Sequence, residues 1–251
     1  MDAPEIRLIP VYLEDEILPG DGLLQKLNAA LRHQKIALAG NDVIVIKHKI
    51  ISKAEGRVVR LESVRPRKSA VSWGRRYHVD ARVIELSLRE SKRIVRQKNG
   101  VLITETHYGF VCANSGVDAS NVDGGKSAVL LPENSDRSAA RLRSQIKKAF
   151  GISVAVIVSD SFGRPWREGL TEVAIGVAGI QPLHDYRGER DPHGYKLRAT
   201  TEAVADELAC AAGLVCGKLS RTPVCIVRGF SGRRGRGSAR DLVRKKNDLF
   251  R

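Results

Sequence analysis

The segment 111–127, VCANSGVDASNVDGGKS, ends in Gly125-Lys126-Ser127, the last three residues of the phosphate-binding pattern GxxxxGK[ST]. In that pattern the first glycine would fall at position 120, which is occupied by Ser120. A helix should also follow the serine, so that its N-terminus faces the phosphates. The residues that follow, AVLLPE, reach a proline within five positions. This segment therefore does not predict a nucleotide-binding P-loop.

Asp118 and Asn121 are the residues of this segment whose side-chain oxygens suit a metal ion or a nucleotide. An EF-hand calcium loop that began at Asp118 would need an acidic residue at its twelfth position, where Val129 stands. The small neighbours would let a metal–nucleotide complex approach. They would equally allow the two side chains to hydrogen-bond their own backbone in a surface turn. The segment alone leaves both interpretations open.

The segment SDSFGRPWREG, residues 159–169, places polar side chains at the end of an apolar strand. Asp160 ends that strand, where ligand and metal residues commonly lie in open α/β sheets, and Ser161 adds a hydroxyl. An acid beside a hydroxyl suits Mg²⁺ or Mn²⁺, and two arginines, Arg164 among them, suit phosphate or carboxylate. The alternative is a salt-bridged turn in which Trp166 packs into the core.

The segment KHKIISKAEGR, residues 47–57, is basic around an apolar strand end. Lys47, Lys49 and Lys53, together with Ser52, suit a triphosphate, and the alternative is a solvated basic edge of a strand. The three segments together supply acids for two divalent ions and cations for phosphates, whereas no Ser-His-Asp or Cys-His nucleophile set is evident. This combination predicts phosphoryl transfer without a Walker motif.

The periodicity of apolar residues predicts the elements that carry these segments. Strands are expected at 5–12, 42–47, 101–106, 109–114, 151–160, 171–179 and 223–229, and helices at 21–34, 79–96, 135–149 and 200–216. Strands and helices are mixed without a regular βαβ rhythm, which favours an α+β fold over a doubly wound sheet. No Pro/Gly/Ser linker divides the chain, although the basic stretch 62–78 is a candidate junction. We therefore expect a single domain over residues 1–251.

The bulk composition is that of a soluble globular protein. Hydrophobic residues make up 42% of the chain and charged residues 28%, and the apolar runs are too short to span a bilayer. The N-terminus has neither the basic nor the apolar region of a secretory signal. The four cysteines show no CxxC spacing, so reduced thiols and a cytoplasmic location are expected.

The net charge of +15 is concentrated in two stretches. Residues 57–98 contain 13 Lys/Arg against 4 Asp/Glu, and residues 228–251 contain 9 against 2. Nucleic acid is the first partner to consider. However, the aromatic residues are scattered, and neither an RNP-like aromatic pair nor a helix-turn-helix pattern accompanies the charge. We therefore do not expect nucleic acid as a partner, and phosphorylated small molecules suit the charge as well.

Several blocks of the chain resemble, in order and spacing, those of the coenzyme F420-0:γ-glutamyl ligases. They are ISKAEGRVV, VCANSGVDASNV, SDSFGRPWREGLTEVAIGVAG, DYRGERDPHG, ADELACAAGLVCGK, PVCIVRG and GSARDLVR. The resemblance covers nearly the whole chain and is strongest to the bacterial form of the ligase domain. In many actinobacteria that domain is fused to a C-terminal nitroreductase-like domain, and we expect this chain to be the ligase domain without it.

The resemblance implies a GTP-dependent ligase. GTP would phosphorylate the lactyl carboxylate of F420-0, and the amino group of L-glutamate would attack the acyl phosphate to form an amide. Further cycles would add γ-linked glutamates. The family resemblance also implies Mg²⁺ or Mn²⁺, with two ions expected, and K⁺ as a further candidate ion. It implies an intertwined homodimer built from two intimately packed mixed α/β subdomains.

Residue by residue, the resemblance makes Asp118 and Asp160 the metal-binding aspartates and Asn121 a GTP contact. Ser161 stands where the family usually has threonine, and it keeps the hydroxyl for the metal. Lys53 corresponds to the lysine of SKAEG that reaches GTP. Asp118, Asp160 and Arg164 are the expected catalytic residues. Further nucleotide contacts are expected at Glu14, Asp15, Glu16, Ile17, His48, Lys49, Gly217 and Lys218.

Two of these positions depart from the family pattern. The N-terminal contact segment reads LEDEI where GLPEI is more usual, and Lys218 stands where some archaeal members have a glutamate near the second metal. The loop GFSGRRGRGSARD is also more basic than usual. It either sets substrate or tail-length preference or is a solvated run of charge.

Two other functions stay open. A ligase of the same fold would act on a different phosphorylated carboxylic acid, because the sequence does not reveal the deazaflavin pocket. A non-catalytic protein that binds nucleotides or nucleic acid through its basic surface is the second alternative. Such a binder would have no need of Asp118 and Asp160 together, so the enzyme is favoured.

Overall fold

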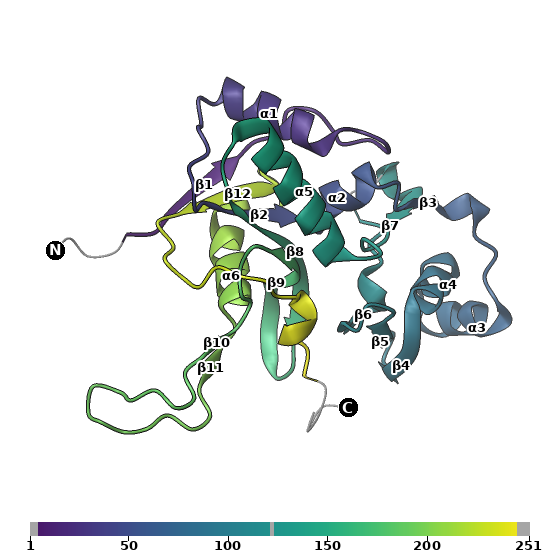
Figure 1. The fold of residues 1–251 in the computed structure, drawn as a ribbon. Coiled ribbons are helices and arrows are strands. Elements are labelled where there is room, and N and C mark those ends of the chain that lie inside the picture. Colours follow the sequence, from purple (N-terminus) through teal and green to yellow (C-terminus); the bar gives the residue numbers. More distant parts are fainter. Residues whose placement is uncertain (1–4, 121–122, 245–251) are drawn as a thin grey trace.

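The computed structural model describes residues 5–120 and 123–244, and Figure 1 shows its ribbon. The strands are β1 (Arg7–Val11), β2 (Val43–Lys47), β3 (Val58–Arg60), β4 (Ser91–Lys98), β5 (Val101–Thr106), β6 (Val111–Ala113), β7 (Ser127–Val129), β8 (Ala155–Arg164), β9 (Arg167–Ala178), β10 (His184–Asp185), β11 (Thr201–Glu202) and β12 (Val224–Arg228). The helices are α1 (Leu23–His33), α2 (His48–Ala54), α3 (Lys68–Tyr77), α4 (Ala81–Arg89), α5 (Ser135–Phe150) and α6 (Val204–Cys216). Short 3₁₀ helices cover Leu61–Ser63, Asn114–Gly116, Asp123–Gly125 and Ala239–Leu242. This mixture of helices and sheets confirms the predicted α+β class.

The main sheet has the strand order β1-β12-β2-β8-β9, in which β2 and β8 are parallel and the other neighbours antiparallel. Its three central strands contain the apolar runs VIVI, AVIVS and VCIV, which are buried throughout. Such continuous runs are typical of strands that are covered on both faces. Because β2 and β8 are parallel, their carboxyl ends meet at one edge of the sheet, where Lys47 pairs with Ser159.

Helices α5 and α6 cover opposite faces of this sheet (Figure 1). On one face Ser135 of α5 lies against Gly176 of β9, where an added Cβ would meet the serine carbonyl oxygen at 2.4 Å. On the other face Cys216 of α6 lies beside Cys225 of β12. The strand register places Gly176 and Cys225 on opposite faces. Both helices therefore pack on a single large apolar core.

A second part of the chain, roughly residues 58–131, packs around small apolar clusters of its own (Figure 1). Strands β3 and β7 form one ribbon, and β4, β5 and β6 form a three-stranded antiparallel sheet. Helices α3 and α4 pack against each other beside this sheet. One cluster contains Leu61, Leu86 and Leu130, and the other contains Ile84 and Leu102. These clusters hold the segment that carries Asp118.

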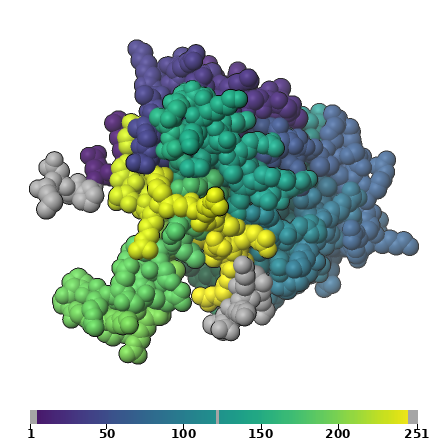
Figure 2. Space-filling model, in the orientation of Figure 1, coloured from purple at the N-terminus to yellow at the C-terminus, as the bar shows by residue number. Residues whose placement is uncertain are grey.

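Residues 183–203 form an arm that projects from the rest of the chain (Figures 1 and 2). Its base is the two-residue ladder of β10 and β11, and most of its side chains are exposed. In the part of the chain that the structure describes, no helix has the length and apolar character needed to cross a membrane.

The structure corrects the helix predicted at 79–96. Helix α4 ends at Arg89, and residues 91–98 form strand β4, which pairs with β5 across Asn99-Gly100. Both turn residues have positive φ, 50° and 79°, the conformation of the tight hairpin turns for which Asn-Gly is a strong signal. The apolar residues beyond Arg89 fit a helical period only by coincidence. Residues 68–77, within the expected junction, form helix α3.

Strands β8 and β9 are longer than predicted and make one hairpin that includes the segment 159–169. The prediction ended the first strand at position 160 and began the next at 171. The ladder instead continues as far as the pair Arg164–Arg167. The polar residues beyond Ser159 thus lie in a strand that projects past the core. The pattern of apolar residues does not predict this extension, because the projecting part of the strand is polar.

Candidate active site

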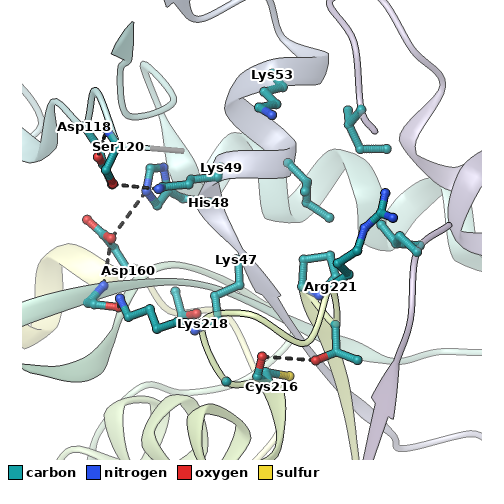
Figure 3. Close-up of a pocket in the computed structure, with 18 of the residues that line it drawn as sticks. Lys47, His48, Lys49, Lys53, Asp118, Ser120, Asp160, Cys216, Lys218 and Arg221 are labelled. Atoms are coloured by element: carbon teal, nitrogen blue, oxygen red, sulfur yellow. Dashed lines mark hydrogen bonds and ion pairs between the residues drawn. The ribbon is translucent and has the colours of Figure 1, made fainter. Parts of the chain in front are cut away.

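A cavity of about 510 Å³ opens at the edge of the main sheet where β2 and β8 end. Most of the residues expected to contact a nucleotide or metal line it (Figure 3). They are Asp15, Glu16, Ile17, His48, Lys49, Lys53, Asp118, Asp160, Ser161, Gly217 and Lys218. These residues come from five separate parts of the chain, and the tertiary structure brings them to one place.

Helix α2 begins at His48, directly after β2, and supplies two cations of the cavity, Lys49 and Lys53. The sequence predicted only a strand end here, with no helix at 48–54, so α2 was missed. Its buried residues are His48, Ile51 and Ser52, and the last two follow His48 at the helical spacings of three and four. Lys49 follows His48 directly, and Lys53 follows Ser52 directly. This periodicity, followed by Gly56 at φ 71°, is the signal that would have predicted the helix.

Asp118 is held by both its backbone and its side chain. Its backbone exchanges hydrogen bonds with Val129, at 3.0 and 2.8 Å. Its Oδ2 lies 2.7 Å from Nζ of Lys49, and its Oδ1 accepts the N–H of Ser120 at 2.6 Å. Burial opposes ionisation of Asp118, but the hydrogen bonds from Lys49 and Ser120 outweigh it, so the pKa of this carboxyl lies below its usual value.

The tail of the P-loop-like pattern has a structural role in this arrangement. Residue Ser127 begins strand β7 rather than a helix, so no helix N-terminus faces the cavity at this point. Lys126 is exposed and does not line the cavity. The strand that starts at Ser127 instead presents Val129 to the backbone of Asp118. The prediction that this is not a P-loop is confirmed.

Asp160 lies in β8, beside the buried His48 (Figure 3). Its Oδ1 lies 3.3 Å from Nε2 of His48 and accepts the N–H of Ser161 at 2.7 Å. Burial opposes ionisation of Asp160, yet the charge and hydrogen bond of His48 hold the pKa of this carboxyl below its usual value. The negative charge of Asp118 acts in the opposite direction, which places the two carboxylates within interaction range.

Asp118, Asp160 and the hydroxyl of Ser161 are the oxygen donors that fit a divalent cation. Mg²⁺ and Mn²⁺ prefer such ligands. The described residues donate no hydrogen bond to Oδ2 of Asp160, so this oxygen is available to a cation. Within the described residues no group of three or more His, Cys, Asp or Glu side chains forms a closed metal cage. The donor set therefore suits an ion that keeps water and phosphate oxygens as its other ligands.

Glu172 is a site residue that the sequence analysis missed. Its side chain is 9% exposed and comes from β9, opposite Ser161 in the hairpin. It accepts hydrogen bonds from Ser159 at 3.0 Å, from Ser161 at 2.7 Å and from the ammonium of Lys47. A buried acid within an apolar strand is a usable signal, because such acids are rarely buried without partners. Glu172 therefore orients Ser161, a candidate metal ligand.

Lysines and one arginine give the cavity its positive charge (Figure 3). Nζ of Lys218 lies 2.9 Å from Oγ of Ser161, so it approaches the metal-donor group directly. Lys53 pairs with Glu16 at 2.6 Å. Lys47, one of the lysines expected to suit a triphosphate, also lines the cavity. Arg221 lines it too and was not predicted. A site with this many cations suits the oxygens of a polyphosphate.

Not all predicted residues reach the cavity. The side chain of Glu14 lies 3.4 Å from His33 and does not line it, although its carbonyl oxygen accepts a hydrogen bond from Arg221 at 2.6 Å. Arg164 also lies outside the cavity lining, and its guanidinium donates to the carbonyl oxygen of Glu168 at 3.0 Å. Asn121 lies outside the described residues.

The alternative interpretation of residues 159–169, a turn with Trp166 in the core, is wrong. Trp166 is 84% exposed and has φ 55°, at the tip of the β8–β9 hairpin. The hairpin ladder ends at the pair Arg164–Arg167, so the chain reverses beyond the edge of the core.

Comparisons with known proteins identify the family of the chain. A family model described as F420-0:Gamma-glutamyl ligase matches residues 14–229. The chain is 42% identical over 229 residues to the coenzyme F420:L-glutamate ligase of Methanocaldococcus jannaschii. This alignment covers 90% of this chain and 91% of that protein. The chain is 41% identical over 254 residues to the coenzyme F420:L-glutamate ligase of Methanopyrus kandleri, covering 99% and 98% of the two chains. The corresponding protein of Methanothermobacter thermautotrophicus is 42% identical over 250 residues, covering 98% and 99%. These matches confirm the resemblance seen in the sequence blocks, and the chain belongs to the F420-0:gamma-glutamyl ligase family.

Proposed function

We propose that this chain is a GTP-dependent ligase that joins L-glutamate to coenzyme F420-0. The γ-phosphoryl group of GTP moves to the terminal carboxylate of F420-0, giving an acyl phosphate and GDP. The amino group of L-glutamate then attacks the acyl carbon, phosphate leaves, and an amide forms. Further cycles add γ-linked glutamates. The names of the relatives support the glutamate and F420 part of this proposal.

One observation carries the proposal: Asp118 and Asp160, from distant segments, line the same cavity as Lys49 and Lys53. A protein that only bound phosphates would use the lysines and would gain nothing from two adjacent carboxylates. A phosphoryl-transfer site needs both, because two anionic reactants must be brought together. The proposal assigns the carboxylates to a metal and the lysines to phosphate oxygens.

Acids and cations of the cavity neutralise each other in the absence of substrate. Lys49 is paired with Asp118, and Lys53 with Glu16. A polyphosphate competes with Glu16 for Lys53, and Glu16 is 64% exposed, so breaking that pair costs little. Lys218 and Arg221 are oriented toward the same space and add positive charge for the phosphates and for the carboxylate that is phosphorylated.

The donor set fits Mg²⁺ or Mn²⁺, with Asp118, Asp160 and Ser161 as the protein ligands. Bound there, such an ion supplies charge neutralisation between the phosphoryl group and the attacking carboxylate. We propose two ions, and K⁺ as a further ion to be varied in the assay. Glu172 holds the Ser161 hydroxyl at 2.7 Å and so fixes one ligand in place before any ion arrives.

We also propose a homodimer, with the 1–251 chain as a single ligase domain. Sedimentation at several protein concentrations tests the first of these proposals directly. A monomer at assay concentration that retains full activity contradicts it.

The decisive experiment mixes the protein with GTP, L-glutamate, F420-0, Mn²⁺ and K⁺. We expect GDP release together with a product heavier than F420-0 by whole glutamyl residues, both measured in the same sample by chromatography and mass spectrometry. A parallel series replaces F420-0 with other phosphorylated carboxylic acids. Turnover only in that series shows that the substrate is a different acid. GTP binding with no turnover in any mixture shows a non-catalytic binder.

A further inference from the structure

A second cavity, of about 700 Å³, lies at the opposite end of the main sheet from the candidate active site. Asn41 precedes β2 and lines this cavity, whereas Lys47 ends β2 and lines the other one. A strand of five residues spans roughly 16 Å, so the two cavities are separate. The walls are α5, the loop that follows β9 and the C-terminal segment, which lies against α5 on the face shown in Figure 2.

Among the described residues, the charged side chains that line this cavity are four arginines and one acid. The arginines are Arg137, Arg143, Arg234 and Arg236. Both carboxylate oxygens of the acid, Asp136, already accept hydrogen bonds from other residues. One of its oxygens accepts the backbone N–H groups of Val177 and Ala239, and the other accepts the hydroxyls of Tyr108 and Ser238. The lining therefore has an excess of three positive charges, and its one carboxylate has no free oxygen for an arginine.

Arg143 and Arg234 are partly buried, and each donates to a backbone carbonyl rather than to an acid. Nε of Arg143 donates to the oxygen of Val154 at 2.9 Å, and Arg234 donates to the oxygen of Asn41. Gly179 makes room for the first guanidinium, because an added Cβ would lie 2.4 Å from Nε of Arg143. Burial and the neighbouring charge of Arg143 lower the pKa of Arg234 from its usual value, although the charge of Asp42 acts in the opposite direction.

Asp42, an acid outside the lining whose charge acts on Arg234, is also occupied. Both oxygens of Asp42 accept hydrogen bonds from Arg228, at 2.9 and 2.8 Å, and one of them also accepts the N–H of Ala39. Among the described residues, no carboxylate forms an ion pair with Arg143, Arg234 or Arg236. Arg137 lies 3.8 Å from Glu133, at the surface, and is the one arginine of the set with such a partner.

Arg143 and Arg234 repel each other, and neither forms an ion pair with a carboxylate in the part of the chain that the structure describes. An external anion stabilises two such partly buried guanidiniums. We propose that this cavity binds a small polyanion, held by Arg143 and Arg234 inside and by Arg236 at the rim. Planar guanidinium groups bind phosphate and carboxylate oxygens alike in bidentate geometry, so the ligand is either a polyphosphate or an oligocarboxylate. This site does not depend on the ligase activity proposed above.

The test measures binding of pyrophosphate and of citrate by calorimetry, with acetate as a singly charged control. We compare the wild type with the double variant Arg143→Gln/Arg234→Gln. The variant Lys49→Gln/Lys53→Gln removes anion binding in the first cavity. Arg141→Gln is the control, because Arg141 is an exposed residue of α5 outside the second cavity. We expect the Lys49/Lys53 variant to retain one polyanion per chain. The Arg143/Arg234 variant should bind at that site at least tenfold more weakly, and Arg141→Gln should bind as wild type.

Tighter binding of pyrophosphate than of citrate identifies a phosphate-bearing ligand, and the reverse order identifies an oligocarboxylate. Arg236 is exposed, so Arg236→Gln does not endanger folding and keeps the test valid if the double variant is unstable. Arg236→Gln should weaken binding of the anion severalfold. The proposal is overturned if the Lys49/Lys53 variant binds neither pyrophosphate nor citrate. It is also overturned if the arginine variants bind pyrophosphate and citrate with the affinities of the wild type. It is also overturned if the arginine variants change the sedimentation of the protein, because the arginines would then face a second copy of the chain.

Discussion

Lys49 and Asp118 form an ion pair of 2.7 Å across the candidate active site, although one residue follows β2 in the main sheet and the other belongs to the second part of the chain. The pair joins the cationic helix α2 to the loop that carries the first candidate metal ligand. Next to it, Nε2 of His48 lies 3.3 Å from Oδ1 of Asp160. Two successive residues of one helix thus each hold one of the two carboxylates.

From this pairing we expect Asp160→Asn and Asp118→Asn to lose at least 100-fold in kcat, because each removes a charge from the metal-donor set. The fold should be retained, as measured by circular dichroism, since neither carboxylate lies in the apolar core. Mn²⁺ binding, followed by electron paramagnetic resonance without substrates, should weaken in both variants. Wild-type turnover by Asp160→Asn would exclude the metal assignment.

Glu172→Gln should lower Mn²⁺ affinity or kcat by about 10- to 100-fold, because partners behind a metal ligand typically have effects of that size. The glutamine removes the negative charge beside Lys47 and weakens the hold on Ser161. The KM for L-glutamate should change little, which distinguishes positioning from general damage to the site. Glu207→Gln, on the exposed side of α6, is the matched control, and equal effects of the two substitutions would argue against a specific role of Glu172.

Lys53→Gln should raise the KM for GTP about tenfold, whereas Lys126→Gln should leave it unchanged. The first lysine lines the cavity and the second is exposed outside it, despite its place in the sequence GKS. Steady-state kinetics with GTP as the varied substrate measures both. A rise in KM for Lys126→Gln alone would restore the P-loop interpretation.

Gly176→Ala should destabilise the protein by about 2 kcal/mol or more, because the new methyl group meets the backbone of Ser135 at the start of α5 and the helix has to shift. Gly163→Ala in the same hairpin is the control, since its Cβ finds only Leu170 at 3.8 Å. Urea unfolding of the two variants gives the free energies. Equal stability of both would show that α5 does not pack as closely on β9 as the structure indicates.

Stability should depend on pH through Glu85, whose side chain is 4% exposed and accepts hydrogen bonds from Arg67 and Arg89. The hydrogen bonds from Arg67 lower the pKa of Glu85 from 4.5 to about 2. The folded pKa is below the unfolded value, so this contribution is fully present above about pH 4.5 and is lost as the pH falls toward 2.

We expect Glu85→Gln to cost about 2 kcal/mol at pH 7, less than the full shift implies because both arginines are half-exposed. The difference from wild type should shrink between pH 4.5 and pH 3. Urea unfolding at a series of pH values measures it. A difference that stays constant down to pH 3 would assign the loss to packing rather than to the charge of Glu85.

Much of the sheet was predictable from the sequence, because strands covered on both faces are continuous apolar runs that few other structures tolerate. The runs at 43–47, 155–159 and 224–227 all lie in predicted strands. The secondary-structure prediction was wrong where the spacing of apolar residues fits both a helix and a strand. Residues 91–98 fit a helix when only their apolar positions are counted, and pairing with β5 decided that they form a strand.

For the candidate site, the sequence by itself determined the chemistry: carboxylates at 118 and 160, a hydroxyl at 161 and lysines at 49 and 53. Only the tertiary structure decided that these groups share one cavity, because the parallel pairing of β2 with β8 brings two distant strand ends to the same edge. It also decided that Glu172 accepts a hydrogen bond from Ser161 and that Arg164 stays outside the cavity lining, since the β8–β9 register pairs Glu172 with Ser161 and carries Arg164 past the core. Residue types specify which bonds can form, whereas strand register and packing specify which residues are close enough to form them.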